Sequence, residues 1–238
     1  MIWTKEIFVT GSQCGLKTEL SMLSTFALVE DAVSGLMGEL EVDGITAKEK
    51  YNAIWLYTKN RIKFFKSAKW NERIKIQCYI SKITPIRLNF DTIITNKLGE
   101  TICQSKVELC GIDFETRRIR KVETIGIKQE FAEPNLALEI NFDIDKAEGE
   151  TNEFQTKVET SNIDYLHHTN NVEYVRFLLN TYSVKQLDEN EIKSIEVNYI
   201  GQSFEGETLT VQKTKLKNKD VFHVTRSADK IISAEIDF

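Results

Sequence analysis

Apolar residues recur at helical spacing between residues 16 and 40. Within LKTELSMLSTFALVEDAVSGLMGEL every third or fourth residue is apolar, which predicts a helix of roughly 20 residues with one buried face. Ser21 or Ser24 is the expected N-cap, because a serine hydroxyl can accept a hydrogen bond from the first turn of a helix. The apolar face consists of Leu20, Leu23, Phe26, Ala27, Ala32, Leu36 and Leu40.

Alternating apolar and polar residues follow this helix and predict an antiparallel sheet. Strand-like segments lie at 53–65, 72–83, 86–96 and 101–114. The alternation in the second segment predicts one packed face and one face in water. The expected buried face holds Ile74, Ile76, Cys78 and Ile80, and the expected wet face holds Arg73, Lys75, Gln77 and Tyr79.

The same order of elements recurs in the second half. A strand at 154–164 precedes a helix at about 170–184, whose expected buried stripe includes Tyr174, Phe177, Leu178 and Tyr182. Four more strand-like segments follow, at 192–202, 207–217, 220–228 and 230–238. The acidic, weakly patterned stretch 126–152 reads as a connection, so we expect domains at 1–125 and 153–238. A long helix followed by a sheet that can wrap around it predicts an α+β fold in each.

Composition and charge exclude several classes of function. The formal net charge of −5 over 238 residues argues against a general nucleic-acid binder. No apolar stretch reaches membrane-spanning length and the start MIWTKEIFVTGSQ is no signal peptide, so we expect a cytoplasmic protein without a membrane partner. The cysteines, without metal-ligand spacing, are expected to be reduced, packed thiols. Cys103 and Cys110, at odd separation on one strand, should face opposite sides of the sheet.

One polar stretch, SNIDYLHHTNNVEY at 161–174, carries the candidate chemistry. Asp164 and His168 stand four residues apart at the entry to the second helix, close enough to hold a water molecule between them. The start of a helix offers free N–H groups and partial positive charge, which suit a developing oxyanion. His168 can take or orient a proton near neutral pH, and Asp164 would fix its tautomer or act as the base itself.

Structural explanations stand beside these. Asp164 or Asn170 could simply cap the helix. His167 is expected to be a solvated or packing residue, and His223 a sheet histidine. The cationic run TRRIRKV at 116–122 is either a solvated surface strand or a docking site for an acidic partner. The aromatic residues expected in the first core are Phe26, Trp55, Phe64, Phe65 and Trp70.

Several segments together resemble the acyl-acyl carrier protein thioesterases of bacteria and plastids. They are IWLYTKNRIKFFKSAKWNERIKIQCYI, GIDFETRRIRKV and NIDYLHHTNNVEY, in the family's order and approximate spacing. The resemblance implies two tandem hotdog domains, the first lodging the acyl chain and the second catalytic. It also implies hydrolysis of fatty acyl thioesters with no metal or organic cofactor, with acyl carrier protein as partner and a homodimer as one expected assembly. The residues it implies are Asp164 and His168 for catalysis and Asn170, Asn171 and Trp55 for substrate binding.

Two positions depart from the family's pattern. Leu166 replaces the middle asparagine of the motif and can form no side-chain hydrogen bond. Ile200 and Gly201 stand where plant members carry Glu-Cys, and Glu196 lies four positions before Ile200. Leu166 motivates one alternative, a catalytically impaired double hotdog that binds acyl chains or a protein partner. A second alternative keeps the enzyme class and changes the carrier, which gives an acyl-coenzyme A thioesterase.

Overall fold

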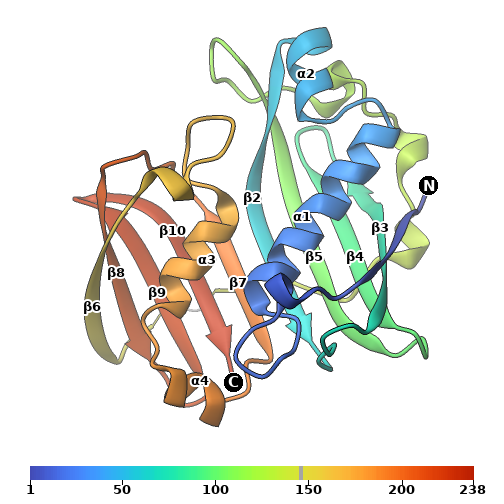
Figure 1. The fold of residues 1–238 in the computed structure, drawn as a ribbon. Coiled ribbons are helices and arrows are strands. Elements are labelled where there is room, and N and C mark those ends of the chain that lie inside the picture. Colours follow the sequence, from blue (N-terminus) through green and yellow to red (C-terminus); the bar gives the residue numbers. More distant parts are fainter. Residues whose placement is uncertain (145–146) are drawn as a thin grey trace. The chain divides into compact units, whose positions relative to one another are not determined.

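The computed structural model describes residues 1–144 and 147–238 and divides the chain into two compact units, Met1–Ile140 and Asn141–Phe238 (Figure 1). The first fifteen residues of the stretch expected as a connection, 126–140, therefore belong to the first unit. No helix in the described part of the chain combines the length and apolar composition needed to cross a bilayer.

The first unit is an antiparallel sheet with one long helix against one face (Figure 1). The strands run in the order β1-β3-β4-β5-β2. The strands and helices are β1 (Trp3–Phe8), α1 (Met22–Glu39), α2 (Gly44–Tyr51), β2 (Ala53–Phe64), β3 (Arg73–Ile83), β4 (Leu88–Asn96) and β5 (Thr101–Asp113). Short 3-10 turns are η1 (Gly11–Gln13), η2 (Val122–Ile125), η3 (Gln129–Phe131) and η4 (Pro134–Leu136). Helix α2 was not expected from the sequence.

The second unit repeats this plan with strand order β7-β10-β9-β8-β6. Its elements are β6 (Glu150–Lys157), η5 (Thr160–Asn162), α3 (Asn171–Leu179), α4 (Val184–Glu189), β7 (Ser194–Tyr199), β8 (Thr208–Lys215), β9 (Lys219–Arg226) and β10 (Asp229–Asp237). The prediction of one helix to residue 184 is wrong in its second part. Helix α3 ends at Leu179, and the Ser183 hydroxyl accepts the N–H of Gln186 and starts a separate short helix.

Helix α1 begins where the sequence predicts. Ser21 is its N-cap and accepts the N–H of Ser24 at 3.1 Å. Phe26, Ala32 and Leu36 of the predicted apolar face are buried, as are four other apolar side chains of the helix. The helix approaches β1 at Gly35, where the ring of Trp3 lies.

The predicted wet face of β3 is exposed at Arg73 and half-buried at Lys75 and Gln77, but its far end is covered, contrary to the prediction. Tyr79 is 2% exposed and its hydroxyl donates to the carbonyl of Leu136. Asp91, fully buried in β4, accepts hydrogen bonds from the Ser81 hydroxyl at 2.8 Å and the Leu138 N–H at 2.6 Å. Lys106 stands 3.5 Å from Asp91. We call residues 132–138 the strap, because they are tied across these strands.

Some of the other predictions about packing are confirmed and one is wrong. Ile74, Ile76, Cys78 and Ile80 are at most 1% exposed, which confirms the predicted buried face. Cys103 and Cys110 lie on opposite faces of β5, as predicted, and all four cysteines are free. Burial raises the pKa of Cys78 and Cys103 to about 12, so these thiols stay protonated. The prediction that Phe65 and Trp70 belong to the core is wrong: they are 55% and 64% exposed.

The contact between α1 and Trp3 predicts opposite effects for two glycines of one helix. A Cβ at Gly35 would lie 2.6 Å from ring atoms of Trp3, so Gly35→Ala should lower the free energy of unfolding by about 1–3 kcal/mol through overpacking. Gly38 has no such neighbour within 4 Å. Gly38→Ala should therefore raise the free energy of unfolding by about 0.5–1 kcal/mol, because alanine loses less backbone entropy on folding than glycine. Denaturant unfolding measures both, and equal changes would contradict this account of α1 packing.

Candidate active site at the start of helix α3

A turn closed by backbone hydrogen bonds leads into α3. The N–H of Asp164 donates to the carbonyl of His168 at 2.9 Å, and the N–H of His167 donates to that of Asp164 at 3.0 Å. Ile163 and Thr169 form a β-bridge that closes the loop. His167 completes the reversal with a φ of +62°, in the left-handed region. Asp164 and His168 are thereby held at the two sides of one small loop.

The carboxylate of Asp164 braces this loop from inside. Its Oδ1 accepts the N–H of Leu166 at 2.8 Å and the N–H of His168 at 3.4 Å. The helix cap belongs instead to Asn170, whose side chain accepts the N–H of Val172 at 2.8 Å. Of the two capping alternatives, the structure therefore assigns capping to Asn170, while Asp164 stabilises the turn next to His168.

The imidazole of His168 is half-buried and lies against an aromatic ring. Phe204 packs against it in a T-shaped arrangement, with ring centroids 5.4 Å apart and planes at 66°. Phe204 is itself 43% exposed. Asn171, the first residue of α3, is half-buried. The turn thus carries one carboxylate and one imidazole directly before the start of α3, and the imidazole packs against a partly exposed aromatic ring.

A buried hydroxyl network lies directly beneath the turn. Thr169 and Ser203 share a hydrogen bond at 2.7 Å, and Ser203 shares another with the Tyr174 hydroxyl at 2.9 Å. The N–H of Ser203 donates to the same tyrosine oxygen at 3.1 Å. The three residues are at most 4% exposed. Burial raises the pKa of Tyr174, which keeps its hydroxyl protonated as the network requires.

A second brace joins the loop to the helix surface. Asn162 accepts the N–H of Glu159 at 2.8 Å and donates its amide N–H to Glu173 at 2.8 Å. Arg176 pairs with Glu173 at 2.8 Å. Ser203 and Asn162 were not predicted from the sequence as part of the site, because the hydrogen bonds that tie them to α3 and the turn span 11 to 34 residues.

The first unit contains a turn closed by the same backbone hydrogen bonds. The N–H of Gly15 donates to the carbonyl of Glu19 at 2.8 Å, and that of Thr18 donates to the carbonyl of Gly15 at 3.2 Å. Thr18 has a φ of +54°, as His167 has +62°. Ser21 takes the capping role of Asn170. The sequence predicted a repeat of architecture, and the structure extends it to individual backbone hydrogen bonds.

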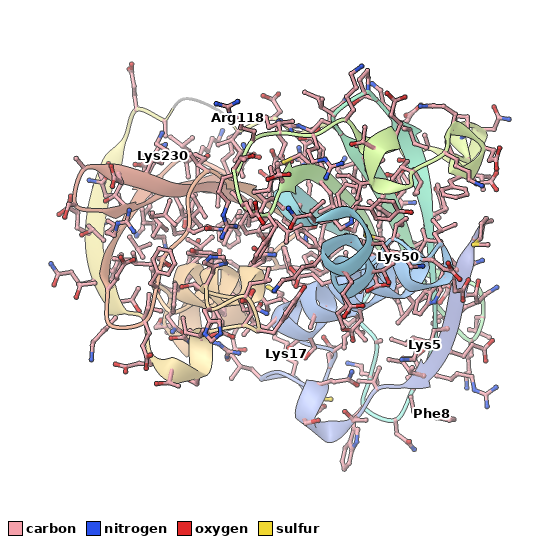
Figure 2. All side chains as sticks on the ribbon, turned by 90° about the horizontal axis from the view of Figure 1, so that it is seen from above. Lys5, Phe8, Lys17, Lys50, Arg118 and Lys230 are labelled. Carbon is pink, nitrogen blue, oxygen red and sulfur yellow. The ribbon has the colours of Figure 1, made fainter. Side chains whose placement is uncertain are left out.

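The side chains of the two turns differ in chemistry. Glu19 stands where the second unit has His168, and it is paired with Lys69. Although burial opposes it, hydrogen bonds from Lys69 and Ser67 hold the pKa of Glu19 below its ordinary value. Gly15 replaces Asp164, and Lys17, labelled in Figure 2, replaces Leu166. The first turn therefore has the backbone of the second without an equivalent of the Asp164–His168 pair, and its own carboxylate, Glu19, is paired with Lys69.

Other candidate residues lie elsewhere. Trp55 is buried in β2 and its indole N–H donates to the carbonyl of Val42 at 2.7 Å, which holds the segment between α1 and α2. Ile200 and Gly201 both donate their N–H groups to the carbonyl of Ile231 at 2.9 Å. Glu196 is buried in β7 and accepts the N–H of Asp143 at 3.0 Å. These hydrogen bonds tie the four residues to segments other than the turn at Asp164.

The remaining polar candidates are His223 and the cationic run at 116–122. His223 lies on β9, as expected, and burial lowers its pKa. Asp113 accepts the N–H groups of Glu115 and Thr116 and forms a turn that leads into the cationic run. The run then pairs with the end of β5 through a single β-bridge between Ile112 and Ile119, which supports the expected surface strand over a short length only. Arg120 is held by the carbonyls of Tyr51 and Thr124. Arg117 and Arg118 remain exposed, the latter visible in Figure 2.

No group of three or more histidine, cysteine, aspartate or glutamate residues in 1–144 and 147–238 is arranged to hold a metal ion. The turn before α3 supplies a carboxylate, an imidazole and helix N–H groups. That set can hold and deprotonate a water molecule next to an electrophilic carbonyl.

Comparison with protein families defines the class. Residues 3–129 match the N-terminal domain and residues 143–238 the C-terminal domain of acyl-ACP thioesterases. The chain belongs to the acyl-ACP thioesterase family, and its fold is the α+β tandem hotdog arrangement predicted from the sequence.

Individual relatives agree with this assignment. The chloroplastic palmitoyl-acyl carrier protein thioesterase of Arabidopsis thaliana is 24% identical over 196 residues, which cover 77% of this chain and 46% of the relative. This chain therefore spans about half the length of such curated relatives. An acyl-ACP thioesterase structure from Bacteroides thetaiotaomicron superposes with a TM-score of 0.86 at 15% identity, covering 100% of this chain and 97% of the other. The 12:0-ACP thioesterase of Umbellularia californica gives 0.79 at 14% identity, covering 99% and 96%.

The paired turns predict that glycine is stabilising at their left-handed positions. A β-branched residue is strained there, so Thr18→Gly should raise the free energy of unfolding by about 1 kcal/mol even after the added entropy of the unfolded chain. His167→Gly should raise it less, because histidine tolerates this conformation better. Urea unfolding of both variants tests the pair, and destabilisation by Thr18→Gly would contradict the strain.

Proposed function

We propose that the chain is a thiolester hydrolase that cleaves fatty acyl-acyl carrier protein into free fatty acid and carrier protein. The observation that carries the proposal is the closed turn that holds Asp164 and His168 together directly before α3. Membership in the acyl-ACP thioesterase family supports the substrate class. The first unit has the same turn without this pair, so the proposed catalytic unit is the second.

Hydrolysis begins with a water molecule held between the two side chains. Both turn-bracing bonds of Asp164 use Oδ1, so we assign Oδ2 to the water. His168, oriented by the ring of Phe204, either takes the proton or positions the water while Asp164 takes it. The water oxygen then attacks the thioester carbonyl carbon. The C–S bond breaks, and the abstracted proton passes to the departing thiolate to give the free thiol.

The start of α3 stabilises the charge that develops during this attack. The first N–H groups of a helix have no partners within the helix, and its dipole favours negative charge there. Asn170 fixes the position of this terminus by capping it, and Asn171 is its first residue. We assign the thioester carbonyl oxygen to this end of α3. Its placement beside the water would then follow from the turn itself.

The first unit would hold the acyl chain beneath α1. Trp55, fixed by Val42, would form part of the wall of this site rather than contact the reacting atoms. Arg117 and Arg118, which are exposed, would attract an acidic carrier protein, whereas Arg120 is committed to backbone carbonyls. Carrier protein and this chain would meet in the cytoplasm, and a second copy could pair along an exposed strand edge to form a dimer.

His168→Ala should lower kcat on acyl-acyl carrier protein by about 10²-fold or more, because the water loses its proton acceptor or its orientation. The measurement is release of free fatty acid under saturating substrate. His167→Ala is the matched control, since its side chain is exposed and we give it no part in the chemistry. Unchanged turnover in His168→Ala would remove this imidazole from the mechanism.

The carrier is tested by side-by-side rates on acyl-acyl carrier protein and acyl-coenzyme A. Arg117→Glu with Arg118→Glu should raise KM for the protein carrier severalfold through lost charge attraction, while kcat and the rate on coenzyme A stay unchanged. A strong wild-type preference for coenzyme A would instead establish the second candidate, an acyl-coenzyme A thioesterase.

Leu166 favours a third candidate, a double hotdog that binds acyl chains without turnover. Its side chain stands between Asp164 and His168 in sequence and offers no hydrogen bond to a water molecule. The same fatty-acid release assay separates this candidate, since it predicts no product above the uncatalysed rate.

A further inference from the structure

Asn60 places a side-chain amide in the interior of the first unit. It lies in β2 opposite Val107 of β5 and is 0% exposed. Its Oδ1 accepts the Ser105 hydroxyl at 3.3 Å. Its Nδ2 is buried and has no hydrogen-bond partner in the described part of the chain. A buried amide donor left without an acceptor is costly, so native proteins seldom keep one unless water or a ligand satisfies it.

Asn60 is hydrogen-bonded to the end of a row of polar residues that crosses the sheet, and it lies one same-face residue pair along from that row, because its own partner is Val107 whereas Ser105 pairs with Ile62. Ser105 of β5 pairs with Thr92 of β4, and Thr92 pairs with Cys78 of β3. These three residues are at most 1% exposed. The row faces α1, because Trp3 pairs with Cys78 on this face and its ring lies against Gly35 of that helix. We call Asn60, Ser105, Thr92 and Cys78 the polar row.

Apolar layers lie on both sides of the polar row along the strands. Same-face neighbours in a strand are two residues apart, about 7 Å, which is the length of a few methylene groups. All the flanking side chains are at most 1% exposed. One layer consists of Ile80, Phe90 and Val107, next to which Asn60 stands in β2, and the other consists of Ile76, Ile94 and Cys103. A chain lying along the strands under α1 would meet apolar, then polar, then apolar surface.

We propose that the polar row binds an oxygen atom carried partway along the acyl chain, so that this protein selects hydroxy- or oxo-acyl substrates. The proposal rests on the proposed function insofar as the first unit lodges the acyl chain. A hydroxyl or carbonyl oxygen on the chain would accept the hydrogen bond that Asn60 Nδ2 can donate. An unsubstituted chain would press methylene groups against this amide and leave it unsatisfied. The apolar layers would hold the chain on each side of the substituent.

Binding of free fatty acids tests this without requiring hydrolysis. Isothermal titration calorimetry compares a long saturated fatty acid with acids of the same length that carry one hydroxyl or one oxo group at successive positions. Wild-type protein should bind at least one substituted acid about tenfold more tightly than the saturated acid, the value of one buried hydrogen bond left unmade. Asn60→Leu should abolish the preference and bind the saturated acid at least as well as wild type. Asn152→Leu in β6 makes the same chemical change in the other unit, and this variant should retain the preference for the substituted acid.

Equal affinities of the wild type for substituted and saturated acids would overturn the proposal, and so would a preference that survives Asn60→Leu or the binding of no acid at all. If Asn60→Leu fails to fold, Ser105→Ala replaces it, and the preference should weaken because the amide loses the hydroxyl that orients it. Fatty-acid release from acyl-acyl carrier protein, with its loss in His168→Ala, is measured in parallel. Thioesterase activity without the binding preference would reject the polar-row site and leave the proposed function standing.

Discussion

Backbone hydrogen bonds close a turn before each main helix, α1 and α3. These bonds fix the positions of the turn residues and of the first turn of the helix in both units. In the second unit the bond from Asp164 N–H to the His168 carbonyl fixes two side chains on one small loop. The same bond between Gly15 and Glu19 exists in the first unit, where no comparable chemistry is present. The turn is therefore a property of the fold, and the candidate site is a set of side chains placed on it.

Buried polar groups hold this arrangement in place. Beneath the second turn, three hydroxyls satisfy one another within the core and tie α3 to the loop before β8. In the first unit, Asp91 and Lys106 tie the strap to the sheet in a similar manner. A polar network in the interior is stable only when each member is satisfied, so such networks specify one geometry. The polar row departs from that rule at Asn60, whose Nδ2 is buried without a partner in the described part of the chain.

Local patterns determined how much of the fold could be read from the sequence. The period of α1, its cap at Ser21 and the buried face of β3 were all predicted, because each depends on neighbours within a few residues. The covering of Tyr79 was not, since the strap has no regular apolar period and its contacts span 57 residues. The break after Leu179 was missed because the apolar pattern continues past the end of the helix.

The candidate site divides in the same way. Asp164, His168 and Asn170 share one short motif, so their proximity was visible in sequence. The capping role of Asn170, the left-handed conformation of His167 and the part played by Ser203 depend on the folded backbone and on a segment about 30 residues later. The roles of Asp164 and His168 as a catalytic pair remain a prediction that the assay decides.

The strap also decides where this chain can be cut. A fragment that stopped at residue 125, where composition alone would end the first domain, would strip the cover from one side of its sheet and leave the Asp91 carboxylate without the Leu138 N–H. Such a fragment would expose Tyr79 and Asp91, which the strap buries in the whole chain, and it would tend to aggregate. Anyone recombining hotdog halves from different relatives should therefore place the junction beyond Ile140.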